Sequence, residues 1–293
     1  MKPELMQIDY LQPIRKNQVE PTYVKDFSEY GQIYQILCSP FEWIKDVMLL
    51  AFENKVLLVV LSFKETILIK KLVEFIHPSR CTALSISPNT SFVTLPNKVV
   101  FAAGAADYKV RVFESNMQND NTCRVLNGHN SYINGVAFDS ENIYLASASD
   151  DNTVKIWYTD GYKLKATLPL TSPAITISWH RSDSGKLLVG EKIGVMKLYN
   201  IETETPILSI DFERSLACAD WSTSDVLILG SLQLGELLLW DLAKPCLPQQ
   251  STILFSENGG FIKFSPQGEH IAAVNSLEGS LKVLRYVATF CQV

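Results

Sequence analysis

The stretch that decides the fold is VKIW, Val154 to Trp157, in which alternating apolar residues end in a large ring. The pattern returns as KVRVF (109–113), MKLY (196–199) and LLLW (237–240), and LKVL (281–284) keeps the alternation without the ring. These motifs end at positions 113, 157, 199, 240 and 284, so the gaps between them are 44, 42, 41 and 44 residues. Such regular spacing indicates an internal repeat of about 42 residues.

Each motif is preceded and followed by other short strand-like segments. A small-residue segment such as YLASAS (144–149) lies just upstream, and a turn rich in Asp, Asn and Gly joins it to the motif. A further alternating segment, such as INGVAFD (133–139), comes before these, and a weaker one, such as LKATLP (164–169), follows. Four strands in a repeat of about 42 residues are typical of a β-propeller blade. No window keeps the apolar period of a helix, so we predict an all-β propeller.

The repeat divides the chain into blades. Residues 1–21 are predicted to be an N-terminal tail, and residues 22–293 a single propeller domain. Six blades are predicted, at 33–76, 82–126, 133–168, 174–210, 216–255 and 260–285.

Composition excludes several classes of protein. Of 293 residues, 47% are hydrophobic and 19% charged, which provides for a core and argues against global disorder. The formal net charge of −5 makes binding to a phosphate backbone a poor hypothesis. The most apolar stretch, 47–63, is interrupted by Glu53, Asn54 and Lys55, so neither part of it could span a bilayer. We therefore expect no direct binding of nucleic acid and no insertion into a membrane.

The third blade resembles the WD40 repeat, because Gly128 and His129 are followed by SASDDNTVKIW at 147–157. The resemblance implies a buried hydrogen-bonded set made by the loop His, a strand Ser, the turn Asp and the terminal Trp. Carried over to this sequence, the set is His129, Ser147 or Ser149, Asp151 and Trp157. The same terminal ring position is held in other blades by Phe113, Tyr199 and Trp240.

An enzymatic interpretation of these residues is disfavoured. A hydrolase triad would need its Ser at an accessible, strained turn, whereas both serines lie within a strand. The histidines, His77, His129, His180 and His270, are far apart in sequence and have no neighbours at metal-ligand spacing. No glycine-rich phosphate loop is present. We predict no catalytic residues, no metal and no cofactor.

Other blades keep only parts of the pattern. The second blade has Asp107 and Phe113, and His77 is a candidate for its loop histidine. The fifth blade has Trp240 and Asp241 without the Gly-His pair. We expect apolar packing to hold most blades.

Longer stretches resemble the small WD-repeat nucleoporins of the 37 kDa class. They are 105–139 with ASASDDNTVKIW (146–157), WH (179–180) and LLVGEKIGVMKLYN (187–200). The resemblance implies a non-catalytic scaffold subunit of the Y-shaped outer-ring complex of the nuclear pore, which supports pore assembly and the transport of protein and mRNA. The implied partners are other Y-complex nucleoporins, above all the large helical scaffold nucleoporin of the 160 kDa class. The implied location is the nuclear envelope and, for vertebrate members, also the mitotic kinetochore.

Two questions stay open at this level. The family implies seven blades, so either Thr22 to Phe27 supplies the last strand of the sixth blade, or a seventh blade is incomplete because the chain is shortened. The second expectation is favoured. A different nuclear WD40 adaptor, such as a ubiquitin-ligase substrate receptor or a histone-peptide reader, is the alternative function, and a propeller hydrolase is a distant third.

Overall fold

A computed structural model describes residues 11–13, 23–63, 67–93, 95–118 and 121–286. Their strands form six four-stranded sheets, the six blades of a β-propeller that the repeat predicts. The predicted blade boundaries agree with the sheets to within two residues at each end. Helical structure in the described residues is limited to two single-turn 3₁₀ helices, η1 (Ser28–Tyr30) and η2 (Glu42–Ile44).

The strands of blades one to three follow one another along the chain. They are β2 (Gln35–Cys38), β3 (Val47–Ala51), β4 (Lys55–Phe63) and β5 (Ile67–Ile76) in blade one; β6 (Cys81–Ile86), β7 (Val99–Ala105), β8 (Val110–Ser115) and β9 (Asn121–Leu126) in blade two; and β10 (Ile133–Phe138), β11 (Tyr144–Ser149), β12 (Thr153–Tyr158) and β13 (Leu164–Pro169) in blade three.

Blades four and five repeat this order, and blade six takes one strand from the N-terminal part of the chain. The strands are β14 (Ala174–His180), β15 (Asp183–Glu191), β16 (Val195–Asn200) and β17 (Thr205–Asp211) in blade four; β18 (Leu216–Trp221), β19 (Ile228–Gln233), β20 (Glu236–Asp241) and β21 (Gln250–Ile253) in blade five; and β22 (Phe261–Phe264), β23 (His270–Asn275), β24 (Ser280–Tyr286) and β1 (Leu11–Pro13) in blade six.

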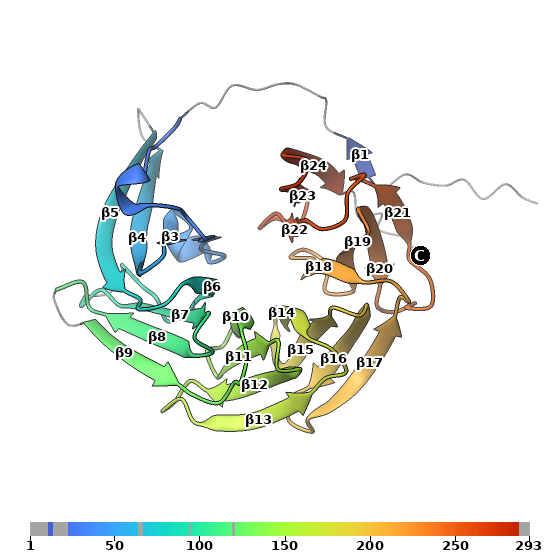
Figure 1. Cartoon of the computed structure of the whole chain (residues 1–293), viewed down its shortest axis with the longest axis horizontal. Coiled ribbons are helices and arrows are strands. Elements are labelled where there is room, and N and C mark those ends of the chain that lie inside the picture. Colours follow the sequence, from blue (N-terminus) through green and yellow to red (C-terminus); the bar gives the residue numbers. More distant parts are fainter. Residues whose placement is uncertain (1–10, 14–22, 64–66, 94, 119–120, 287–293) are drawn as a thin grey trace, which may run out of the picture. The chain divides into compact units, whose positions relative to one another are not determined.

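The strand that completes blade six is not the candidate that the less favoured of the two expectations named. β1 pairs antiparallel with β24, as Figure 1 shows, whereas the described residues 23–27 form no strand. Phe27 instead lies 6.4 Å from Phe52, between ring centroids, so this segment covers blade one. Pro13, which lacks an N–H, is tolerated because β1 is an edge strand.

The predicted tail therefore includes a strand, while residues 1–10 and 14–21 of it lie outside the described residues, as does Thr22. Every described strand belongs to one of the six sheets, and a seventh blade stays a prediction.

The chain divides into two compact units. One holds β1 and β18 to β24 together with Lys192–Val195, and the other holds β2 to β15 and most of β16 and β17. The prediction of a single domain over residues 22–293 stays a prediction.

Within the larger unit the core lies between successive blades. The first strand of a blade packs on the first and second strands of the blade before it, so small residues are needed where the two approach closely. A Cβ at Gly104 would lie 2.5 Å from Cγ2 of Ile133, and one at Gly135 would lie 3.1 Å from Cγ1 of Ile177. The small-residue segments noted in the sequence are thus explained by close contact between neighbouring blades.

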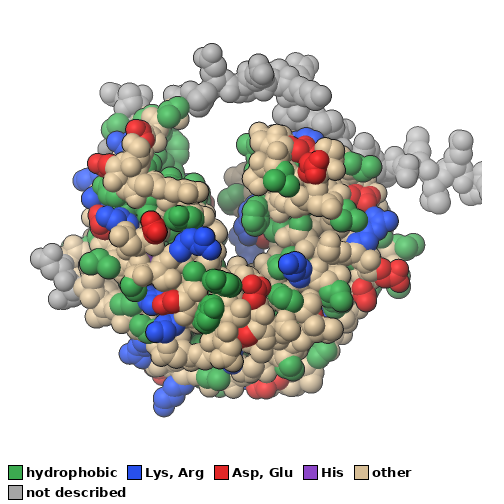
Figure 2. Space-filling view, viewed as in Figure 1, with side chains coloured by type: hydrophobic (Ala, Val, Ile, Leu, Met, Phe, Trp, Pro, Cys, Tyr) green, Lys and Arg blue, Asp and Glu red, His purple; other side chains and the backbone are tan. Residues whose placement is uncertain are grey.

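The surface mixes both signs of charge. Figure 2 shows acidic and basic side chains interspersed over the face in view. In the part of the chain that the structure describes, no helix combines the length and apolar character needed to cross a membrane.

Candidate functional site

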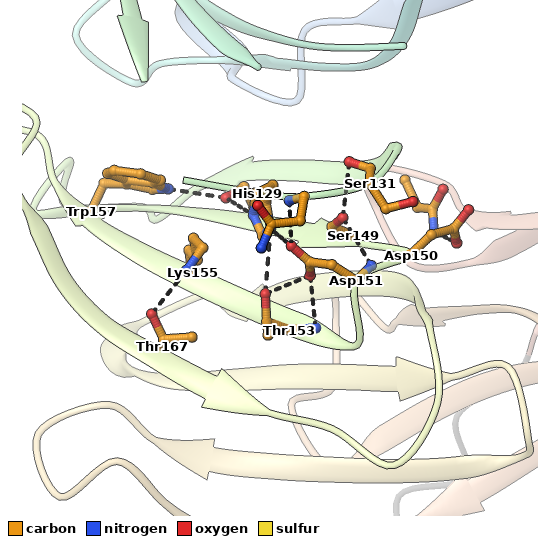
Figure 3. Close-up of polar contacts among 12 residues, drawn as sticks. His129, Ser131, Ser149, Asp150, Asp151, Thr153, Lys155, Trp157 and Thr167 are labelled. Atoms are coloured by element: carbon orange, nitrogen blue, oxygen red, sulfur yellow. Dashed lines mark hydrogen bonds and ion pairs between the residues drawn. The ribbon is translucent and has the colours of Figure 1, made fainter. Parts of the chain in front are cut away.

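Three segments of blade three bring the predicted set together. His129 lies in the loop before β10, Ser147 lies on the central strand β11, and Trp157 lies near the end of β12. Asp151 follows β11 in the turn that leads into β12. β11 and β12 pair with Ser147 opposite Lys155, which places the turn that holds Asp151 at the end of the same hairpin. The turn and β11 both face the loop that carries His129 (Figure 3).

The hydrogen bonds run in one direction through the set. The indole Nε1 of Trp157 donates to Oγ of Ser147 over 2.9 Å. The Ser147 hydroxyl donates to Nε2 of His129 over 2.9 Å, and Nδ1 of His129 donates to Oδ2 of Asp151 over 2.8 Å. Each donor thus has an acceptor when the imidazole is neutral and carries its proton on Nδ1.

The Asp151 carboxylate is anchored by further donors. The Asn130 N–H donates to Oδ2 over 2.9 Å, and Thr153 donates to Oδ1 through its N–H and its hydroxyl over 3.0 and 2.6 Å. Burial by itself raises the pKa of Asp151, but the bonds from Thr153, Asn130 and His129 outweigh it, so the pKa lies below the usual 3.8. The carboxylate is therefore ionised at neutral pH.

The two candidate serines have different roles. Ser147 joins Trp157 to His129, whereas the Ser149 hydroxyl donates to the Ser131 carbonyl over 3.1 Å and accepts the Asp151 N–H over 3.1 Å. Ser149 thus ties the turn to the loop through the main chain.

The chemistry open to this set is limited by burial. The Ser147 residue is 0% exposed and the His129 side chain 1% exposed, so a substrate could not reach the hydroxyl. Ser147, His129 and Asp151 are arranged in the sequence of contacts of a hydrolase triad, but their polar groups are hydrogen-bonded within the set. The arrangement acts as a clamp between a loop and a turn.

The other ring positions lie one to a blade, buried and apart from the set. Phe113, Tyr199 and Trp240 are 3%, 4% and 5% exposed. Trp240 Nε1 donates to Oγ of Ser231 over 2.9 Å, which repeats the contact between Trp157 and Ser147 in blade five. Phe113 stacks on Phe101 at 4.9 Å, and burial raises the pKa of the Tyr199 hydroxyl.

Blade two holds an incomplete version of the set. His77 Nδ1 bonds the Ser79 carbonyl, but its buried Nε2 has no hydrogen-bond partner among the described residues. The position of Ser147 is held here by Ala103, which has no hydroxyl. Asp107 is bonded by the Arg111 guanidinium instead, at 2.9 Å through Nη1. His77 is therefore a buried loop histidine that makes no hydrogen bond to the turn carboxylate.

Restoring the missing hydroxyl should stabilise the protein. We expect Ala103→Ser to raise the free energy of unfolding by about 1 kcal/mol, because the new O–H can donate to Nε2 of His77, which otherwise has no hydrogen-bond partner among the described residues. The matched control is Ala102→Ser, which points to the opposite face of β7 into an apolar cluster and should destabilise by a similar amount. Urea unfolding of both variants measures the difference. A loss of stability in both would show that His77 Nε2 is out of reach.

Blades four and six use acidic and amide side chains that sequence reasoning missed. In blade four, Glu191 is 0% exposed, accepts the N–H groups of Thr171 and Ser172 over 2.8 Å each, and binds Nζ of Lys197 at 2.7 Å. In blade six, Glu278 accepts two bonds from Ser256, and Asn275 donates to the Glu257 carbonyl over 3.0 Å. Glu191 and Asn275 occupy the same place in the second strand of their blades as Ser149 does in blade three. A polar residue at this place in the repeat is the sequence signal that could have identified them.

The remaining histidines do not join the set. His180 ends β14 and His270 begins β23. Within the described ranges, no three side chains of His, Cys, Asp or Glu gather as they would around a metal ion.

Two buried histidines and the partly buried His180 predict a pH dependence of stability. Burial lowers the pKa of His129 below the ordinary 6.5, against the raising effect of Asp151, and burial lowers the pKa values of His77 and His180 as well. The unfolded chain takes up these protons near pH 6.5, whereas the folded chain resists them. We therefore expect the free energy of unfolding to fall as the pH is lowered through this value toward the folded pKa.

Urea unfolding at a series of pH values tests this, with His129→Asn as the comparison. The variant should lose part of the slope in this window, because one of the three histidines is gone. Stability that rises on acidification, or an unchanged slope in the variant, would contradict it.

Comparison with known proteins places this geometry in a family. Residues 120–158, which contain the whole set, match the model of the "WD domain, G-beta repeat" family. The chain is 30% identical over 269 residues to human nucleoporin Nup37, covering 88% of this chain and 82% of the relative. It belongs to the Nup37 family of WD-repeat nucleoporins.

Further similarities agree with this family. Drosophila melanogaster nucleoporin Nup37 is 30% identical over 210 residues, covering 71% of this chain and 65% of that protein. A chain in a solved structure titled "Crystal Structure of Mitotic Checkpoint Complex" superimposes with a TM-score of 0.65 at 16% identity, over 93% of this chain and 100% of that one. At that identity the match concerns the fold alone. The resemblance to a WD-repeat nucleoporin of the 37 kDa class is thus confirmed.

Proposed function

We propose that this Nup37-family protein is a non-enzymatic scaffold subunit of the outer ring of the nuclear pore complex. Its role is to join other nucleoporins of the Y-shaped complex, above all the large helical scaffold nucleoporin of the 160 kDa class, and so to support pore assembly and nucleocytoplasmic transport. The observation that carries the proposal is the 30% identity to human Nup37 over 82% of that protein.

The geometry is consistent with a scaffold. The polar set that most resembles a catalytic group is closed to substrate, because Ser147 is 0% exposed and bonded on both sides. The same clamp holds a loop and a turn of blade three, which gives a rigid end to the blade on which partners can dock. Rigid loops lower the entropy lost on binding.

The test is purification of the tagged full chain from nuclear-envelope extract, with quantification of the proteins recovered in stoichiometric amounts. A tagged propeller from an unrelated cytosolic protein serves as the control. We expect the outer-ring nucleoporins, including the 160 kDa class, at near-equal amounts. Recovery of a cullin adaptor or of histones in their place would overturn the proposal in favour of a different nuclear WD40 adaptor.

A further inference from the structure

Two tyrosines from neighbouring blades form a pair on the surface. Tyr108 lies in the turn between β7 and β8 of blade two, and Tyr132 lies in the loop before β10 of blade three. Their rings meet edge to face, with centroids 5.3 Å apart and an interplanar angle of 88°. Even so, Tyr108 stays 40% exposed and Tyr132 45% exposed. The pair thus presents aromatic surface to solvent while each ring restrains the other.

The backbone does not explain the choice of tyrosine at 108. Tyr108 has φ = +69°, a left-handed conformation that is costly for a large side chain. The same turn position in blade three is Asn152, with φ = +61°, and Asn adopts this conformation readily. A tyrosine at this position makes the turn less stable than an asparagine would, which points to a role for its ring.

A positioned carboxylate belongs to a main-chain neighbour of the pair. The Asp150 N–H donates to the Tyr132 carbonyl over 2.9 Å, so the main chains of the two residues are adjacent. Asn134 Nδ2 donates to Oδ1 of Asp150 over 2.6 Å and also to the Ala174 carbonyl over 3.0 Å, which fixes the carboxylate. Asp150 is exposed and lies at the end of the buried set opposite Trp157 (Figure 3).

We propose that Tyr108, Tyr132 and Asp150 form a docking surface for an arginine- or lysine-bearing segment of a partner polypeptide. A guanidinium or ammonium group would lie against an aromatic face and bond the carboxylate oxygen that Asn134 leaves free. Tyrosine and a pre-positioned partner for arginine are the usual components of interface hot spots. This surface rests on the proposed function only in supposing that the chain joins other proteins.

The direct test uses the purified full chain carrying fluorotyrosine and two synthetic Gly/Ser peptides. One peptide contains two arginines, and its twin has glutamine in their place. At low ionic strength we expect the arginine peptide to shift the fluorine resonances of Tyr108 and Tyr132. It should bind about tenfold more tightly than the glutamine twin.

Tyr108→Asn separates binding from folding. It should weaken peptide binding by about tenfold, while the unfolding temperature stays the same or rises because Asn suits the left-handed turn. Asp150→Asn should weaken binding several-fold. The matched control is Tyr158→Ala, since Tyr158 is also 41% exposed and paired, with Tyr144 at 5.7 Å, but ends β12, at the opposite end of that strand from the turn that holds Asp150.

Three results would overturn the proposal: no preference for arginine over glutamine, unchanged binding by Tyr108→Asn, or tighter binding of a glutamate version of the peptide. Because the assay uses purified protein, such a failure leaves the purification of outer-ring nucleoporins as an independent test of the proposed function.

Discussion

Replacing Asp151 by Ala is expected to lower the free energy of unfolding by about 3 kcal/mol. The carboxylate accepts four hydrogen bonds, from His129, from Asn130 and two from Thr153. The variant leaves the His129 Nδ1 proton inside a site where that side chain is 1% exposed, and removes the link between the loop and the turn. Unsatisfied buried donors cost more than the lost bonds alone.

Urea unfolding of Asp151→Ala, His129→Ala and the double variant measures the coupling between the two residues. We expect the double variant to lose clearly less than the sum, because each single change already breaks the same contact. Asp150→Ala is the control at the neighbouring exposed carboxylate and should change stability little. Additive losses, or equal losses at Asp150 and Asp151, would contradict a buried clamp.

Glu191→Ala is expected to be at least as damaging, with a loss of about 3–5 kcal/mol. Glu191 is 0% exposed, and its partner Lys197 has a side chain only 18% exposed, so the variant leaves a largely buried cation without its anion. It also leaves the N–H groups of Thr171 and Ser172 without their acceptor. Breaking one side of a buried pair is costly because the remaining charge has no compensation.

The controls separate charge from hydrogen bonding. Glu191→Gln retains an acceptor oxygen for the two N–H groups, so it should lose less than Glu191→Ala. Lys197→Met in the Glu191→Gln background should recover part of the loss, because the uncompensated cation is removed. If Glu191→Ala unfolds at the same urea concentration as the wild-type chain, the ion pair makes no net contribution and the expectation is wrong.

These two sites solve the same structural problem with different residues. In blade three a turn carboxylate holds the preceding loop through the His129 side chain and the Asn130 N–H, while in blade four a carboxylate at the end of the second strand holds it through two N–H groups. The loop before the first strand has N–H groups that need acceptors, and either geometry supplies one. This explains why the Gly-His signature is absent from blades that nonetheless have an ordered loop.

Much of blade three could be predicted from its sequence. The resemblance to the WD40 repeat implies the set of His129, Ser147, Asp151 and Trp157. Strand pairing within one hairpin then accounts for the closeness of Ser147, Asp151 and Trp157. The division between Ser147 and Ser149 could not be predicted, since both serines lie on the same side of the strand at a spacing of two. Only the three-dimensional position of the loop decides which of them meets His129.

By itself, the sequence determined the repeat and the six blades with their boundaries, because these depend on periodicity and local strand chemistry. The family followed from the resemblance of longer stretches to known nucleoporins. Tertiary structure alone decided that Leu11–Pro13, rather than the described residues 23–27, completes blade six, since pairing between distant parts of the chain leaves no local pattern. It also decided that Glu191 is a buried clamp and that Tyr108 meets Tyr132 across two blades. Burial and contacts between blades depend on how the sheets pack, which no short stretch of sequence encodes.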